Sequence, residues 1–174
     1  ICSNVISMGR KYKIEIKLGK DIKKAVKINS IPIEKLTELL GIINIVIFSP
    51  EDLKLVREGP KERRNFMDRE ISQLRPNYYS LIHNYQKILI QRNNLLKNIK
   101  IDDNLLDVYD EQLSITTQKI MIYRKEFLDN ISPIASANHY KISSGKENLI
   151  IKYQPNINLK SSDSNDYTKI MDIF

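Results

Sequence analysis

Apolar and polar residues alternate strictly near the beginning of the chain. Between residues 11 and 18, a tyrosine, two isoleucines and a leucine alternate with three lysines and a glutamate. A period of two places each set of side chains on its own face of a strand, so we predict a half-buried β-strand here. Residues 19–21 carry a Gly-Lys-Asp turn signal, and residues 25–28 predict a second, weaker strand.

The next stretch combines a short helical pattern with an apolar run. Residues 33–40 predict a short helix, and Gly41 ends it because glycine readily adopts the left-handed conformation that follows many helices. Residues 42–48 are apolar except for Asn44, and their number suits a strand rather than a helix. We therefore predict a buried strand over residues 42–48.

Beyond residue 60, apolar residues recur every three or four positions, which is the period of an amphipathic helix. The pattern predicts helices over residues 60–74, 76–98 and 106–134. A short polar loop near residues 100–104 joins the two longer helices, and this favours an antiparallel pair. The apolar stripe of the second helix comprises Tyr78, Leu81, Ile82, Tyr85, Ile88, Leu89, Leu95 and Leu96, and that of the third includes Tyr109, Leu113, Ile120, Phe127 and Ile131.

The C-terminal part of the chain changes character again. Residues 143–146 predict a turn, and residues 148–154 alternate like a strand. Residues 156–166 are rich in Ser, Asp and Asn and predict a mobile loop, while residues 167–174 resemble the start of a helix without a stop signal. Because the chain also begins with Ile rather than Met, we expect it to be part of a longer protein.

These elements predict an α+β, helix-rich fold in three parts. Residues 1–58 form a β-rich segment with short helices, and residues 59–142 form a helical lobe built on an antiparallel pair of long helices. Residues 143–174 supply a return strand, a mobile loop and a truncated helix.

Charge points to a polyanionic partner. The net charge of the 174 residues is +7, which favours nucleic acid. An AT-rich genome, which encodes many Lys, Asn and Ile residues, explains the same charge without a partner, so both interpretations stay open.

The composition also bears on the class of protein. A hydrophobic content of 41% is enough for a core. No apolar run approaches the length of a membrane span, and the single cysteine excludes an intrachain disulfide, so we expect a cytoplasmic protein without membrane contact.

Residues 48–68 are the most informative stretch of the sequence. Ser49 is a natural helix N-cap, followed by Pro50 at the first helical position. Glu51 and Asp52 then lie in the positive first turn, and Ser49-x-x-Asp52 is close to a capping box. We therefore predict a short capped helix that begins at residue 50.

A second helix start follows directly. Gly59-Pro60 ends the first helix and opens the next. Arg63 and Arg64 then fall in its first turn, where the helix dipole disfavours cations, so a negative group is expected to compensate them.

This stretch resembles the central motif of the RecF family of bacterial recombination mediators. One position departs from the family pattern, because Glu58 stands where the family has its first glycine, which questions a left-handed backbone at that residue. Looser likeness continues at residues 91–97, 107–113 and 145–153. The matching motif positions are Pro50, Glu51, Leu55, Val56, Gly59, Pro60, Arg63, Arg64, Phe66, Met67 and Asp68.

The resemblance implies a fold and a function. It implies the helical lobe and flanking β-strands of a P-loop ATPase head similar to ABC and SMC heads. The parent protein is then expected to bind ATP and Mg²⁺, to dimerise on nucleotide and to bind DNA at single-strand/double-strand junctions. It is further expected to act with other mediators of the RecF pathway in gap repair, recombinase loading and the SOS response.

The nucleotide motifs of such heads are not found in this sequence. It contains five glycines and no G-x-x-x-x-G-K-[ST]. Gly145-Lys146 comes nearest, but Tyr140 stands where the first glycine belongs. The apolar run at residues 42–48 lacks the acidic end of a Walker B strand, and no ABC signature is visible. The resemblance places these motifs before and after this region, so we expect no catalytic residue, no bound cofactor and no ATP hydrolysis by this segment alone.

Metal and catalytic constellations are also missing from the sequence. His83, His139 and Cys2 cannot assemble a common zinc site by themselves, so no metal site is expected.

The candidate functional residues are cationic. Arg63 and Arg64 either contact phosphate or a partner subunit, or form a buried ion pair with Glu51, Asp52 or Asp68 that joins the two helices. Arg92 and Arg124 lie on apolar stripes and invite the same two interpretations, with Asp110 or Glu111 as partners across the helix pair.

A basic group at the end of the second long helix is the other candidate. Lys87, Arg92, Lys97 and Lys100 can follow a DNA backbone, or they can be a solvated helix end with favourable charge. A stand-alone basic module that binds nucleic acid, or a protein-interaction domain built on the helix pair, remains the alternative to a RecF segment.

Overall fold

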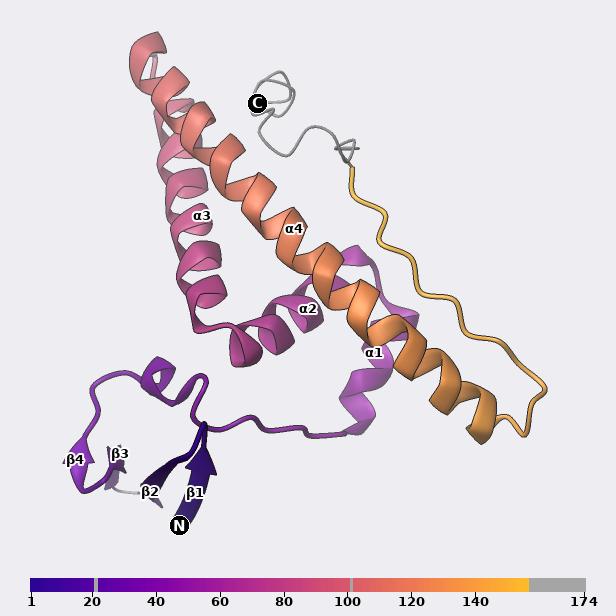
Figure 1. The fold of residues 1–174 in the computed structure, drawn as a ribbon. Helices are drawn as coiled ribbons and strands as arrows, with labels where there is room; N and C mark the ends of the chain where they lie inside the picture. The colour runs from indigo at the N-terminus through magenta and orange to yellow at the C-terminus, as the bar shows by residue number, and fades with distance from the viewer. Residues whose placement is uncertain (21, 101, 157–174) are drawn as a thin grey trace. The chain divides into compact units, whose positions relative to one another are not determined.

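The structure of the chain is a computed structural model that describes residues 1–20, 22–100 and 102–156. It divides into two compact units, Ile1–Asn77 and a second that begins at Tyr78 (Figure 1). The helix start predicted over residues 167–174 and nearly all of the loop predicted over 156–166 lie outside the described residues. The predicted three-part division of the chain stays a prediction.

The first unit contains a four-stranded antiparallel sheet in the order β1-β2-β3-β4. The two strands predicted near the beginning of the chain are confirmed, and they pair with Ile14 opposite Ile28 and Ile16 opposite Val26. The sequence pattern predicted neither outer strand, because one lacks clear alternation and the other has two residues. The strands are β1 (Cys2–Ser7), β2 (Arg10–Gly19), β3 (Ile22–Ile28) and β4 (Ile31–Pro32).

Tight turns close the two outer hairpins of this sheet. Met8 and Gly9 have φ angles of 48° and 75°, and Asn29 and Ser30 have φ angles of 51° and 69°. Two consecutive positive φ angles match the right-handed twist of the flanking strands. These turns set the register of the strands, so that Ile14 lies opposite Ile28. Ile14 is only 3% exposed, which shows that its face of the sheet is covered.

The short helix predicted over residues 33–40 is a single 3₁₀ turn, η1 (Leu36–Leu39). Gly41 follows with a φ of +78°, and a Cβ atom at this residue would lie 3.0 Å from Cγ of Pro76. Both the backbone conformation and the available space require glycine, so Gly41 ends this segment as the sequence predicts.

The predicted buried strand over residues 42–48 is wrong. The run has no regular secondary structure, and Val46 and Phe48 are 92% and 85% exposed. A strand needs a neighbouring strand to share its backbone hydrogen bonds. In the described structure the backbone N–H of Ile45 instead donates to Oε1 of Gln73 at 2.8 Å. The apolar composition indicated a strand but could not supply its partner.

Three helices complete the first unit. They are the 3₁₀ helix η2 (Pro50–Leu53), the single-turn α1 (Lys54–Arg57) and α2 (Pro60–Leu74). The helical spacing places Met67, Ile71 and Leu74 on one face of α2, and of these Met67 and Ile71 are buried whereas Leu74 is 55% exposed. The capped helix start and the Gly-Pro break are therefore confirmed at the predicted positions.

Two long helices dominate the second unit, α3 (Pro76–Leu95) and α4 (Asp103–Ile142) (Figure 1). Arg92 contacts Asp110, and Tyr78 contacts Arg124. The two contact residues are 14 positions apart in each helix (92 − 78 and 124 − 110). The earlier residue of α3, Tyr78, contacts the later residue of α4, Arg124, so the two helices run in opposite directions. The predicted antiparallel pair is confirmed, with contacts separated by about 21 Å along the axes.

The fourth α-helix is longer than the sequence predicted, because it continues through Pro133 to Ile142. Proline inside a helix removes one backbone hydrogen bond and usually ends the helix. Beyond Pro133, however, an extended segment of the chain lies along α4, where Leu149 and Ser136 line the same hollow. This segment therefore packs against the part of α4 that follows Pro133.

The return strand predicted over residues 148–154 is wrong as a strand. Among the described residues the segment pairs with no strand, but its burial still alternates with a period of two. Leu149, Ile151 and Tyr153 are half-buried, and the hydroxyl of Ser132 in α4 donates to the carbonyl of Ile151 at 3.4 Å. The period of two identified an extended segment correctly, but a helix covers it rather than a sheet.

No described helix combines the length and the apolar character needed to cross a lipid bilayer.

Candidate functional site

The junction between the apolar run and α1 is held by a helix cap. The carboxylate of Asp52 accepts a hydrogen bond from the backbone N–H of Ser49 at 2.7 Å and one from its hydroxyl at 3.3 Å. This is the reciprocal half of a capping box. Pro50 is the first residue of η2, and Glu51 is exposed in its first turn. The predicted cap is confirmed, and it fixes where the chain turns into the helices.

The break between α1 and α2 needs no strained backbone. Glu58 is the C-cap of α1 with a φ of −100°, and Gly59 is the N-cap of α2 with a φ of −73°. Both values are ordinary for any residue. The glutamate at the position where the RecF family has glycine is therefore accommodated in extended backbone.

Arg63 bridges this break through backbone carbonyls. Its Nη1 donates to the carbonyl of Glu58 at 3.0 Å and to that of Leu55 at 3.4 Å. The last carbonyls of a short helix have no intrahelical partner, so they are strong acceptors for a nearby cation. The hypothesis of a buried ion pair is wrong for Arg63, because its side chain is exposed and bonds to carbonyls.

Arg64 has the opposite character. Its side chain is exposed, so Arg64 forms no buried ion pair. Two residues further on, Phe66 is half-buried and lies under the guanidinium of Arg69, 5.6 Å from the ring centre. Of the twin arginines, Arg63 acts within the chain, while the guanidinium of Arg64 points to solvent.

The basic residues near the end of α3 also differ from one another, because some are paired and others are exposed. Arg92 forms an ion pair with Asp110, and its Nη2 lies 3.3 Å from Oδ2 of that carboxylate. Lys87, Lys97 and Lys100 are exposed, and the last two lie beyond the end of α3 at Leu95. The ion pair across the helices is thus confirmed for Arg92, and the three lysines present their charges to solvent.

Arg124 takes a partner that the sequence did not indicate. Its Nε donates to the hydroxyl of Tyr78 at 3.2 Å, and the Tyr78 ring meets that of Tyr123 edge-on at 5.3 Å. Tyr78 is fully buried. Its place on the apolar stripe marked it as core, but nothing in the spacing marked its hydroxyl as an acceptor.

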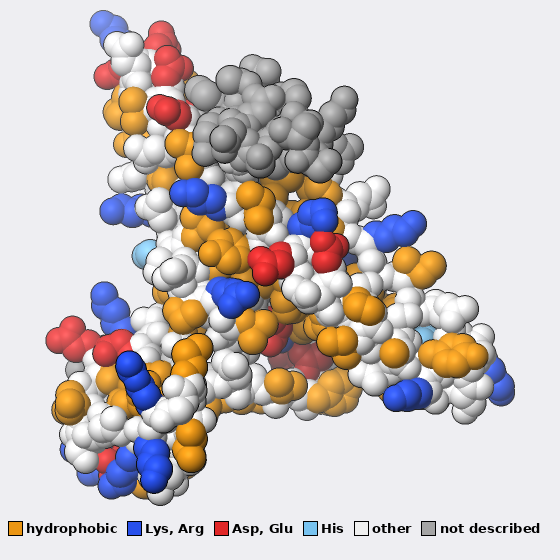
Figure 2. Space-filling view, in the orientation of Figure 1, with side chains coloured by type: hydrophobic (Ala, Val, Ile, Leu, Met, Phe, Trp, Pro, Cys, Tyr) orange, Lys and Arg blue, Asp and Glu red, His pale blue; other side chains and the backbone are white. Residues whose placement is uncertain are grey.

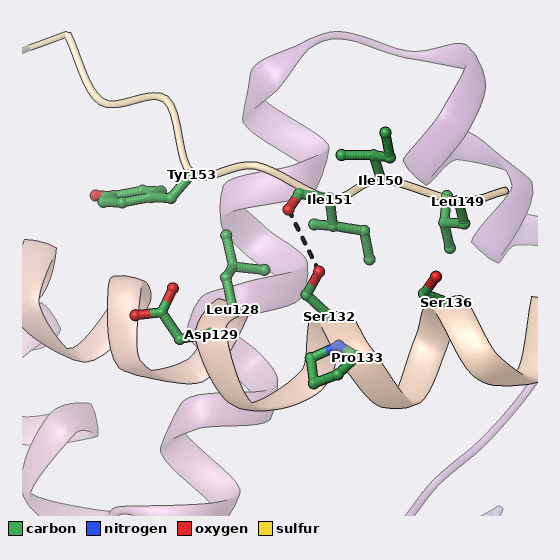
Figure 3. A pocket seen from close by; sticks show the side chains of 9 residues that line it. All are labelled: Leu128, Asp129, Ser132, Pro133, Ser136, Leu149, Ile150, Ile151 and Tyr153. Carbon is green, nitrogen blue, oxygen red and sulfur yellow. Dashed lines mark hydrogen bonds between the residues drawn. The ribbon is translucent and has the colours of Figure 1, made fainter.

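A hollow of about 420 Å³ lies between α4 and the extended segment (Figure 3). Its lining does not suit ATP, because the charged side chain in it is the carboxylate of Asp129 and no Lys or Arg lines it. Nor does the described part of the chain gather three His, Cys, Asp or Glu side chains into a metal site. The lining residues are Leu128, Asp129, Ser132, Pro133, Ser136, Leu149, Ile150, Ile151 and Tyr153.

Comparison with known proteins identifies relatives. No family model matches the chain. It is 49% identical over 160 residues to the DNA replication and repair protein RecF of Clostridioides difficile, covering 91% of the chain and 43% of the relative. It is 47% identical over 156 residues to the protein of the same name from Alkaliphilus oremlandii, covering 90% and 43%. The chain therefore spans less than half the length of these curated relatives.

Solved structures agree with the sequence comparison. A structure described as "the recombination mediator protein RecF-ATPrS in RecFOR pathway" matches with a TM-score of 0.76 and 30% identity over 95% of the chain and 44% of that protein. A RecF-ATP structure matches with the same TM-score and 31% identity, over 93% of the chain and 44% of that protein.

Proposed function

Because this chain belongs to the RecF family, we propose that it forms part of a RecF recombination mediator, an ATP-dependent DNA-binding protein that acts in gap repair and recombinase loading. The similarity to RecF from Clostridioides difficile over 91% of the chain carries this proposal. The helix cap, the Gly-Pro break and the twin arginines, on which the resemblance rests, form one continuous junction between η2, α1 and α2.

We place the nucleotide outside the residues described here. ATP and Mg²⁺ need backbone amides and a lysine around the phosphates, and the hollow beside α4 offers neither. The segment then contributes by transmitting nucleotide state to a dimer surface and to DNA, rather than by chemistry of its own. Partners of the whole protein are DNA at single-strand/double-strand junctions, a second RecF subunit and other mediators of the pathway, in the cytoplasm.

The two arginines of the junction are assigned different roles. Arg63 is a positioning residue, because its bonds to the carbonyls of Leu55 and Glu58 hold α1 against α2. Arg64 is proposed to contact a phosphate or the partner subunit, since its side chain is exposed. Lys87, Lys97 and Lys100 form a second candidate surface.

A chimeric protein tests the proposal. The matching segment of Clostridioides difficile RecF is replaced by this chain, and the chimera is introduced into cells that lack RecF. We expect it to restore survival after DNA damage and to dimerise when ATP is added. A chimera that folds and binds ATP, yet neither dimerises nor restores survival, contradicts the proposal.

Variants of the same chimera test the assigned roles. Arg64→Ala should abolish ATP-dependent dimerisation or repair while leaving the melting temperature unchanged. Arg63→Ala should lower the melting temperature as well. Lys125→Ala, on an exposed face of α4, is the matched control and should change neither property.

A further inference from the structure

The sheet of the first unit has one apolar face and one face rich in lysine. The even-numbered residues of β2 from 12 to 16 are buried or half-buried, whereas Lys11, Lys13 and Lys17 are exposed. Neighbouring side chains of a strand point to opposite faces. The three lysines therefore form a row along the outer face of the strand.

The register of β3 adds a fourth lysine to this row. Lys27 lies directly opposite Glu15, and Ala25 lies opposite Lys17. Residues directly opposite one another in an antiparallel pair point to the same face. We call the exposed surface made by Lys11, Lys13, Lys17 and Lys27 the lysine face. Figure 2 shows several Lys and Arg side chains on the sheet-bearing unit, with acidic and apolar side chains between them.

One carboxylate balances this charge in part. Oε1 of Glu15 lies 3.1 Å from Nζ of Lys13. Its hydrogen bond and its charge raise the pKa of Lys13. On the other side of β2, the residues that face the row from β1 are Cys2, Asn4 and Ile6, and none of them is a Lys, Arg, Asp or Glu. Four lysines and one glutamate leave +3 on the described side chains of this face.

The length of the row fits a nucleic-acid backbone. Lys11 and Lys17 are six residues apart, which is about 20 Å at roughly 3.3 Å per residue. One strand of duplex DNA has a phosphate every 3.4 Å or so of helix axis, hence about six phosphates over this length. Flexible ammonium groups contact such phosphates without reading bases.

We propose that the lysine face binds the phosphate backbone of duplex DNA independently of base sequence. The inference rests on the proposed function, because it assigns the DNA contact of a DNA-repair protein to a particular surface. It places that contact on the sheet of the first unit rather than at the basic end of α3. Glu15 limits the affinity, because it neutralises a neighbouring lysine.

Binding of a short labelled duplex by the 174-residue chain, followed by fluorescence anisotropy over a range of salt concentrations, tests the inference. Each lysine that contacts a phosphate contributes about 0.9 to the slope of log K against log salt. The variant K11Q/K13Q/K17Q/K27Q should reduce the slope by about 2.7, because Glu15 already pairs with Lys13 and leaves three lysines for phosphates, and it should weaken binding at low salt by about a hundredfold. The control K119Q/K141Q/K146Q/K152Q removes the same charge from exposed lysines of the second unit and should change the slope by less than about one.

A variant that binds DNA more tightly shows that the loss of binding in the lysine-face variant does not come from misfolding. Glu15→Gln frees Lys13 and should tighten binding by about tenfold at low salt, which a damaged fold cannot do. The lysine-face variant should retain the far-ultraviolet circular dichroism of the parent chain.

The outcomes separate the two proposals. If the parent chain binds DNA, and the lysine-face variant binds as tightly as the control variant or Glu15→Gln gives no gain, the lysine face is not the site, while the proposed function stands. If the parent chain and the chimeric protein both fail to bind duplex DNA, the proposed function fails and this inference fails with it. Competition by poly-L-glutamate or by anionic lipid vesicles as effective as competition by unlabelled DNA overturns the assignment to nucleic acid.

Discussion

Arg92 and Asp110 join the last turn of α3 to the first turns of α4 through a two-pronged ion pair. The two side chains are 12% and 14% exposed, so water screens their attraction only partly. The pair lies 14 residues along each helix from the Tyr78–Arg124 contact. These two polar contacts help to set the register of the helix pair, because hydrogen bonds are directional whereas apolar contacts are not.

Removing one partner of this ion pair should destabilise the helix pair. We expect Arg92→Ala or Asp110→Ala to lower the free energy of unfolding by about 2 kcal/mol, because the remaining charge stays partly buried without its partner. Urea denaturation measures the change. The exposed pair Lys125–Asp129 is the control, and Lys125→Ala should cost less than about 0.5 kcal/mol. Equal losses for the two pairs would show that burial is not what gives Arg92–Asp110 its strength.

Tyr78 should be sensitive to loss of its hydroxyl. Tyr78→Phe keeps the ring contact with Tyr123 but leaves the Nε of Arg124 without this acceptor. We expect a loss of about 1.5 kcal/mol in the free energy of unfolding. Tyr79→Phe, at a residue that is 41% exposed, is the control and should stay within about 0.5 kcal/mol of the parent. A Tyr78→Phe protein as stable as the parent would mean that this hydrogen bond contributes nothing.

The twin arginines should separate in a stability measurement. Arg63→Ala removes the donor to the carbonyls of Leu55 and Glu58 and should cost about 1 kcal/mol. Amide hydrogen exchange in α1 should quicken as its last turn frays. Arg64→Ala should change stability by less than about 0.5 kcal/mol, because the side chain is exposed. If instead Arg64→Ala is the more damaging change, Arg64 holds the junction together and is not available to a partner.

Two glycines of the first unit should respond differently to alanine. Gly41→Ala should cost about 2 kcal/mol, because φ is +78° and the new methyl group would meet Pro76 at 3.0 Å. Gly59→Ala should change stability by less than about 0.5 kcal/mol, because φ is −73° and nothing lies within 4 Å of the new atom. Thermal unfolding of both variants checks the contrast, which fails if Gly41→Ala melts within a degree or two of Gly59→Ala.

Features that depend on neighbours in the sequence were predicted well. The alternation in β2, the cap formed by Ser49 and Asp52, and the break at Gly59-Pro60 all have their cause within a few residues. The stripes on α3 and α4 were also predicted, because one helix surface repeats its apolar positions regardless of what covers it. The pairing of Arg92 with Asp110 followed from those stripes once the helices were taken as antiparallel.

Features that depend on a distant partner were predicted poorly. An apolar or alternating run specifies an extended chain, but only a second strand turns it into a sheet. Residues 42–48 and 148–154 lack that second strand in the described structure, so neither is a β-strand. Similarly, sequence spacing offered carboxylates as partners for Arg63, whereas the structure supplies backbone carbonyls. For Arg124 the structure adds a tyrosine hydroxyl that the spacing did not indicate.

The sequence by itself therefore determined the helices, the central hairpin and the motif that indicates the RecF family, because local propensity, capping and apolar periodicity act over a few residues. Only the tertiary structure decided which cations are engaged and which are exposed. A guanidinium bonds to whichever acceptor the fold brings within reach, and that distance is not written in the spacing along the chain. The separation of Arg63 from Arg64, and of Arg92 from the exposed lysines beside it, follows from this difference.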